Sequence, residues 1–190
     1  MDQRHHERRS QTGARIFIRH MEKEIVNRVS KSPIITFNLE DLYQEGNRIG
    51  IDISQWLHEG LILIEKNFRE ELKAFDWSVY SNSYIHLYCS TDAIIPAWAY
   101  MLVSTYLNPI AHKVIVGSSK DLEAILYAEA IVKVNEEDYR DRPVIIKGCS
   151  NKPVPESAYL LIIKKLQPVV KSLMFGEACS AVPLYKPKRK

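Results

Sequence analysis

The sequence predicts an α/β protein, a three-layer sandwich built on one mixed, mostly parallel sheet. Strand-like and helix-like segments alternate from residue 84 to residue 175, which is typical of crossover helices over parallel strands. One strand–helix–strand unit also occurs twice, at 84–117 and at 143–176. We expect the N-terminal part of the domain to add a hairpin at one edge of this sheet.

The two copies of the unit are related by a constant offset. Equivalent prolines, tyrosines, leucines and glycines are 59 positions apart, namely Pro96 and Pro155, Tyr100 and Tyr159, Leu107 and Leu166, Pro109 and Pro168, and Gly117 and Gly176. A single copy could not cover both faces of its own strands, so we interpret the pattern as an internal duplication within one core.

Before the repeat, the chain shows short elements separated by breakers. An amphipathic segment from Met21 ends at Pro33, and residues 34–37 follow as a short edge strand. Residues 48–53 alternate polar and apolar side chains, and residues 61–64 are all apolar, so we expect these two strands to pair as the hairpin. Residues 67–75 carry apolar side chains at helical spacing and predict a helix.

Within the repeat region, each helix has a recognisable start. A proline opens the helices at 95–107 and 155–166, where its missing N–H has no intrahelical partner to lose. A third helix is predicted at 120–132. The expected strands are 84–88, 113–116, 144–147 and 172–175.

Length and charge suggest one domain, at 21–186, between two basic tails. The formal net charge of +3 comes from five arginines in residues 1–20 and from the lysines and arginine at the C-terminus. We expect translation to start at Met21, residues 1–20 to be a disordered extension, and residues 187–190 to be a basic tail. No nucleic-acid-binding motif is present, so no nucleic-acid partner is expected.

The composition favours a cytoplasmic protein. No segment is apolar enough for a membrane span or a secretory signal, so no membrane association is expected. Three cysteines are too few for a disulfide framework and are typical of a reducing compartment.

The three cysteines are the candidate functional residues. Cys89 and Cys149 follow strands and precede helix N-termini, where the helix dipole favours a thiolate. Cys179 follows the last strand of the repeat, so parallel strands in one sheet would bring all three to the same edge. Three thiolates could hold iron, zinc or part of an iron–sulfur cluster, with Asp92 or Glu177 completing the ligand set.

A structural reading of these residues is equally open. Free cysteine behaves as a small hydrophobe and is common at buried strand ends, and no CxxC pair is present. Asp92 fits better as a cap of the following helix than as a general base. No glycine-rich phosphate loop is visible, so the sequence identifies no catalytic residue and no organic cofactor.

Several runs of residues resemble a known bacterial family. They are IVNRVSKSPIITFNLEDLY, CSTDAIIPAWAYML, KGCSNKPVPESAY and LQPVVKSLMFGEACSAVPLYK, and they resemble the family called domain of unknown function 2480 from Met21 to about Lys186. Genes of this family are associated with neighbourhoods of iron–sulfur assembly genes. The resemblance therefore implies iron–sulfur assembly proteins as partners, and it favours cluster, iron or persulfide handling by the cysteines.

Three hypotheses of function follow. The first is an accessory factor that binds metal or sulfur through Cys89, Cys149 and Cys179. The second is a structural or protein-interaction module, with its cysteines in the core and its surface bound to a partner or to a second copy of itself. A third hypothesis is an enzyme that acts on a small molecule in the crevice at the strand ends, so whether the protein is an enzyme stays open at this point.

Overall fold

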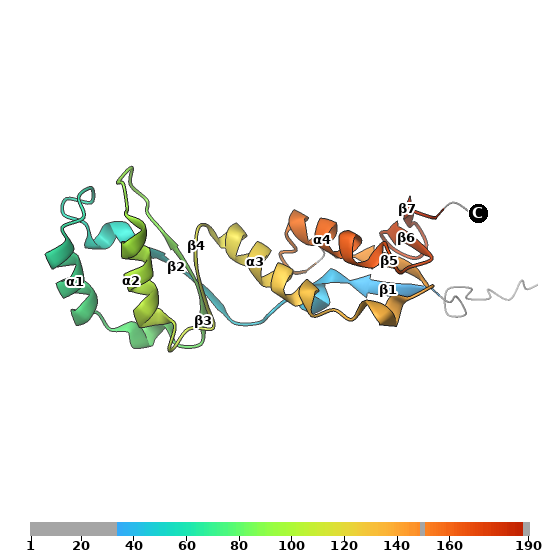
Figure 1. Ribbon diagram of the computed structural model, residues 1–190, viewed down its shortest axis with the longest axis horizontal. Coiled ribbons are helices and arrows are strands. Elements are labelled where there is room, and N and C mark those ends of the chain that lie inside the picture. Colours follow the sequence, from blue (N-terminus) through green and yellow to red (C-terminus); the bar gives the residue numbers. More distant parts are fainter. Residues whose placement is uncertain (1–33, 149–150, 188–190) are drawn as a thin grey trace, which may run out of the picture. The chain divides into compact units, whose positions relative to one another are not determined.

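The computed structural model describes residues 34–148 and 151–187, which form four α-helices and seven strands in two sheets (Figure 1). The predicted α/β class is confirmed. Every strand pairs in parallel with its neighbours except the last, which runs antiparallel. We name the sheets by their central strands, as the β3 sheet and the β5 sheet.

The β3 sheet contains three parallel strands in the order β2 (Asn47–Asp52), β3 (Ser83–Tyr88) and β4 (Lys113–Val116). Helices α1 (Glu65–Ala74) and α2 (Ala97–Leu107) connect them. The buried residues of α2 are Ala99, Val103 and Leu107, four positions apart, so they form one stripe along the helix. This stripe packs in one cluster with Ile85 and Leu87 of β3.

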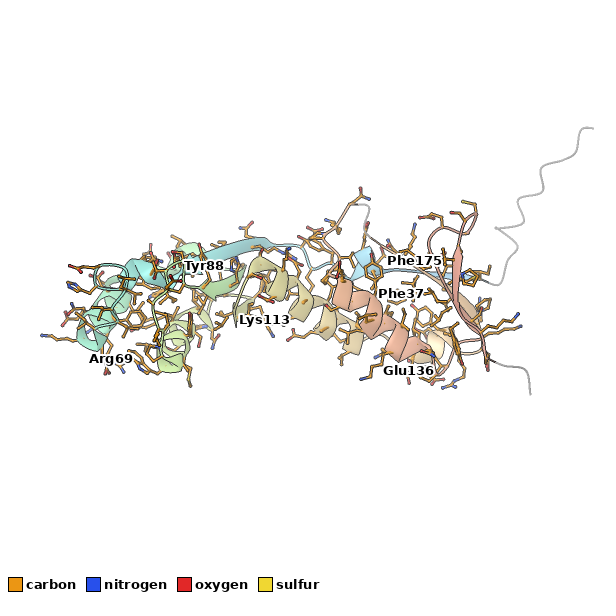
Figure 2. The ribbon with its side chains drawn as sticks, turned by 90° about the horizontal axis from the view of Figure 1, so that it is seen from above. Phe37, Arg69, Tyr88, Lys113, Glu136 and Phe175 are labelled. Atoms are coloured by element: carbon orange, nitrogen blue, oxygen red, sulfur yellow. The ribbon has the colours of Figure 1, made fainter. Side chains whose placement is uncertain are left out.

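The β5 sheet has the order β1 (Ile35–Asn38), β5 (Pro143–Lys147), β6 (Ser172–Phe175) and β7 (Val182–Tyr185). Helix α4 (Glu156–Leu166) connects β5 to β6 and buries Ala158, Ile162 and Leu166 at the same four-residue spacing. Phe37 of β1, which Figure 2 labels, lies in this core. Its ring contacts that of Tyr139 at a centroid distance of 5.6 Å.

Helix α3 (Ser119–Val132) belongs to two hydrophobic clusters. Leu122 and Leu126 pack with residues of β3 and β4, whereas Tyr127 and Ile131 join the core of the β5 sheet. A helix that buries two sides needs apolar residues around more of its circumference than a surface helix does. This requirement explains the mixed apolar pattern of the SKDLEAILYAEAIV segment.

Two features of the predicted architecture are wrong. The hairpin of 48–53 with 61–64 does not form, because β2 pairs in parallel with β3 while residues 61–64 make only an isolated bridge between His58 and Ile62. The strands also divide between two sheets instead of forming one. The division arises because β1 pairs with β5, whereas the next strand, β2, pairs with β3.

The offset of 59 residues recurs in these elements. It relates α2 to α4 and β4 to β6, and it relates Asn82 to Asp141, whose φ values are 56° and 55°. The N–H of Asn82 donates to Ile110 at 2.9 Å, and that of Asp141 donates to Val169 at the same distance. The inference that these pairs arose by duplication stays a prediction, as do the predicted domain limits. The expected extension 1–20 and tail residues 188–190 lie outside the described residues.

Candidate functional site

The side chain of Asp52 links the C-terminal end of β2 to the loop that follows β3. Oδ1 of Asp52, the last residue of β2, accepts the backbone N–H of Ser54 at 2.9 Å and that of Ser90 at 3.1 Å. Burial opposes ionisation of this group, but hydrogen bonds from Ser90 and Ser54 outweigh it and lower the pKa of Asp52. An ionised Asp52 therefore anchors the loop that follows β3.

Cys89 lies in this anchored loop and is half-buried. Its Sγ lies 3.4 Å from Oγ1 of Thr91, which in turn donates to the carbonyl oxygen of Gly60 at 2.7 Å. The hydroxyl of Thr91 thus ties the loop after β3 to the loop before α1. Both loops border the same cleft.

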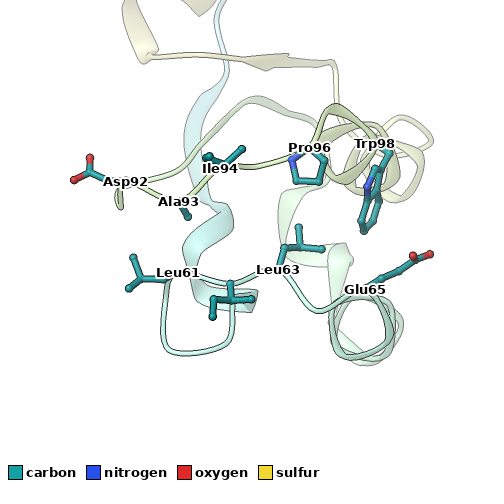
Figure 3. A pocket seen from close by; sticks show the side chains of 9 residues that line it. Leu61, Leu63, Glu65, Asp92, Ala93, Ile94, Pro96 and Trp98 are labelled. Carbon is teal, nitrogen blue, oxygen red and sulfur yellow. The ribbon is translucent and has the colours of Figure 1, made fainter.

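The cleft has a volume of about 720 Å³ and lies between residues 61–65 and residues 92–98 (Figure 3). Its walls are mainly apolar and consist of Leu61, Ile62, Leu63, Ala93, Ile94, Pro96 and Trp98. Two carboxylates, Asp92 and Glu65, are the charged groups among these lining residues, and Figure 3 shows them at opposite ends of the cleft.

Apolar side chains around this cleft are unusually exposed. Ile94 keeps 93% of its surface accessible, and Leu61 and Ile62 each keep 57%. A single exposed apolar residue is ordinary on a protein surface, but several around one cleft indicate an interaction site.

The predicted metal ligands are distributed over separate elements. Cys89 follows β3, whereas Cys179 is exposed and follows β6, a strand of the other sheet. Glu177 lies near Cys179 in sequence, and its carboxylate is 3.5 Å from Nζ of Lys147. The expectation that parallel strands in one sheet would bring these cysteines together thus rested on a single sheet that the chain does not form. The structure also contradicts a core position for Cys179.

Cys149 lies outside the described residues, so its place in a metal site stays a prediction. Within 34–148 and 151–187, no group of three His, Cys, Asp or Glu side chains is arranged to hold a metal ion. Asp92 is exposed and lines the cleft, and it does not cap α2: the N-cap is Pro96, which has no side-chain hydrogen bond. Asp92 is thus a predicted ligand that lines this cleft.

Sequence reasoning missed the apolar residues of the cleft. Leu61 and Ile62 were expected to lie in a hairpin strand, and Ile94 was given no role. One signal was available, since Ile94 and Ile95 are consecutive apolar residues in a loop that precedes a proline-started helix. Only Ile95 packs against the core, which leaves Ile94 directed to solvent.

The comparisons with known proteins give a family and no activity. A family model described as protein of unknown function (DUF2480) matches residues 23–187. No curated protein and no solved structure matches the chain. Among the described residues, no helix is long and apolar enough to cross a membrane. Because the family model covers most of the chain, the protein belongs to the DUF2480 family.

Proposed function

We propose that this DUF2480 protein is a protein-interaction module whose cleft between residues 61–65 and 92–98 holds a short apolar segment of a partner protein, flanked by basic residues. The observation that carries the proposal is Ile94, an isoleucine with 93% of its surface exposed beside an apolar cleft. Burying one such side chain in an interface contributes about 1.5–3 kcal/mol.

The charges at the cleft support the basic flanks of the partner. Asp92 forms no ion pair with any residue in the described ranges, whereas Glu65 is met by Nε of Arg69 at 2.9 Å. A lysine or arginine at the Asp92 end thus gains an unpaired carboxylate. At the Glu65 end it competes with Arg69, so we expect a smaller contribution there.

The anchoring of the loops supports a preformed cleft. Asp52 and the hydroxyl of Thr91 fix the loop after β3, so the partner segment does not have to order it. Binding to a preorganised surface avoids part of the entropy lost on association.

The test is a titration of the full chain with blocked five-residue peptides of identical apolar core. The lysine-flanked peptide Lys-Ile-Leu-Ile-Lys is compared with Glu-Ile-Leu-Ile-Glu and with Lys-Ser-Gly-Ser-Lys by calorimetry. Trp98 lines the cleft and supplies a fluorescence signal, with Trp98→Phe as the control for the other tryptophans. We expect the lysine-flanked apolar peptide to bind at least about tenfold more tightly than either comparison peptide.

Two variants make the test specific to the cleft. Ile94→Asp should weaken binding by at least about tenfold, because about 1.4 kcal/mol of lost burial corresponds to that factor. Leu160→Asp is the matched control, since Leu160 is 70% exposed on α4 and does not line the cleft. Equal binding by both variants would refute the proposal. So would a dimer of the protein alone that dissociates in Ile94→Asp, which would make the occupant a second copy.

A further inference from the structure

A second cavity, distinct from the cleft, lies between the first turns of α3 and α4 and has a volume of about 700 Å³. Residues from three parts of the chain line it: Tyr43 and Arg48 from the β1–β2 region, Lys120 and Glu123 from α3, and the segment 153–156 that begins α4. A cavity of this size accommodates a small organic molecule.

One charged pair in the cavity wall is already neutralised. Nε of Arg48 lies 2.8 Å from Oε1 of Glu123, and their side chains are only 15% and 12% exposed. The guanidinium carbon of Arg48 also lies 4.3 Å from the centre of the Tyr43 ring and 4.9 Å from that of Tyr84. These contacts fix Arg48 and Glu123 as part of the wall, so neither is available as a free charge for a ligand.

Two opposite charges in the same wall remain unpaired. Lys120 in the first turn of α3 and Glu156 in the first turn of α4 form no ion pair with the residues that the structure describes. The N-cap of α4 is Pro155, which makes no side-chain cap hydrogen bond, so the first N–H groups of the helix have no intrahelical acceptor. The site therefore offers donors and a cation for an anionic group, and a carboxylate for a cationic group.

Helix α3, which supplies Lys120 and Glu123 to the cavity wall, also carries a buried polar group, the hydroxyl of Tyr127, which is not among the lining residues. Tyr127 is 1% exposed, and its hydroxyl has no hydrogen-bond partner among the described residues. Burial is the main reason why the pKa of Tyr127 is raised to about 12, and the nearby carboxylates of Glu123 and Glu40 act in the same direction. An unsatisfied buried hydroxyl thus lies one turn along α3 from Glu123, a residue of the cavity wall. Such a group is rare in folded proteins unless a ligand or water meets it.

We propose that this cavity binds a small zwitterion of the α-amino-acid class with an apolar side chain. The carboxylate lies at Lys120 and the first turn of α4, and the ammonium group lies at Glu156. The side chain packs against the apolar surfaces of Tyr43, Val154 and Pro153.

The test uses the full chain and calorimetric titration with L-leucine and L-phenylalanine. Each is compared with an analogue that lacks one charge: isocaproate and phenylpropionate lack the ammonium group, and isopentylamine and phenethylamine lack the carboxylate. At least one of the two amino acids should bind, and both of its single-charge analogues should bind at least about tenfold more weakly. Inorganic phosphate serves as the probe for a plain anion site.

Variants separate the cavity from general charge effects. Lys120→Met and Glu156→Gln should each reduce amino-acid affinity at least about tenfold, whereas Lys66→Met and Glu70→Gln, two exposed α1 residues remote in sequence from the cavity lining, should leave it unchanged. The proposal fails if neither amino acid binds at about 10 mM. It also fails if an analogue or phosphate binds as well as the amino acid, or if the α1 controls weaken binding equally. Thermal melting of each variant without ligand confirms that it is folded.

Discussion

Replacing Glu123 by leucine tests whether the Arg48–Glu123 pair connects the two sheets. Glu123 lies on α3, which packs on both sheets, and Arg48 lies on β2 between the rings of Tyr43 and Tyr84. The single change leaves the guanidinium largely buried without its carboxylate. Breaking a fully buried pair costs about 3–5 kcal/mol and an exposed one about 0–1 kcal/mol. With side chains 15% and 12% exposed, we expect a loss of about 2–3 kcal/mol in the free energy of unfolding.

The double variant shows whether the stability lost in Glu123→Leu comes from the unpaired charge of Arg48. Arg48→Met with Glu123→Leu removes both charges and keeps most of the packing, so it should recover more than half of the stability lost by Glu123→Leu alone. Urea denaturation followed by tryptophan fluorescence and by far-UV circular dichroism measures both. A loss below about 0.5 kcal/mol in the single variant, or losses that simply add in the double variant, would refute the reasoning.

Four further predictions concern single positions. Burial raises the pKa of Asp52, but its hydrogen bonds outweigh burial, so the folded-state pKa lies below the unfolded one. The stabilising effect of Asp52 should therefore be complete above about pH 4 and be lost as the pH falls through the folded-state pKa. Asp52→Asn should flatten the acid side of a stability–pH curve, and an unchanged acid slope would contradict this. Asn82 has a φ of 56°, so Asn82→Ala should lower stability by about 1 kcal/mol in urea denaturation while Asn82→Gly stays within about 0.5 kcal/mol of the wild type; equal losses would be inconsistent with backbone strain. Tyr127→Phe removes a buried hydroxyl that has no partner among the described residues, so without ligand it should raise the melting temperature or leave it unchanged, and a fall of several degrees would indicate a hydrogen bond made in solution. For the cysteines, Cys89→Ser and Cys179→Ser should each leave the metal and sulfide content of anaerobically purified protein unchanged, because the two residues follow strands of different sheets; a loss of bound iron or zinc in both variants would restore the metal-site hypothesis.

Local patterns allowed most helices and strands to be predicted. The spacing of Ala99, Val103 and Leu107, repeated in α4, is an amphipathic stripe that any core-facing helix of this length requires. The prolines mark the two helix starts as expected, although each is the N-cap, one residue before the helix, and not a residue of its first turn. These signals depend only on neighbouring residues, and the tertiary structure of the chain retains them.

Features set by pairing between distant strands were not predictable in the same way. The segment 61–64 has the composition of a strand, yet β2 pairs with β3 across the intervening helix α1. Nothing local distinguishes a strand that joins β5 from one that joins β3. The predicted meeting of Cys89 with Cys179 depended on that choice, and the two residues follow strands of different sheets.

The shape of the candidate cleft also depends on contacts between residues that are distant in the sequence. Whether Ile94 or Ile95 faces the core is decided by how the loop after β3 is held, and that depends on Asp52 and on the contact between Thr91 and Gly60. Both contacts join residues more than 30 positions apart in the chain. The sequence shows the apolar residues of the cleft, but its patterns do not predict that these residues are exposed.

Hydrogen exchange of the full chain with and without the lysine-flanked peptide tests the central claim most directly. If the cleft is the binding site, backbone amides in residues 61–65 and 92–98 should exchange more slowly with peptide present, and this protection should disappear in Ile94→Asp but persist in Leu160→Asp. Unchanged exchange in both segments, or protection confined to other elements such as the start of α4, would contradict the proposed function.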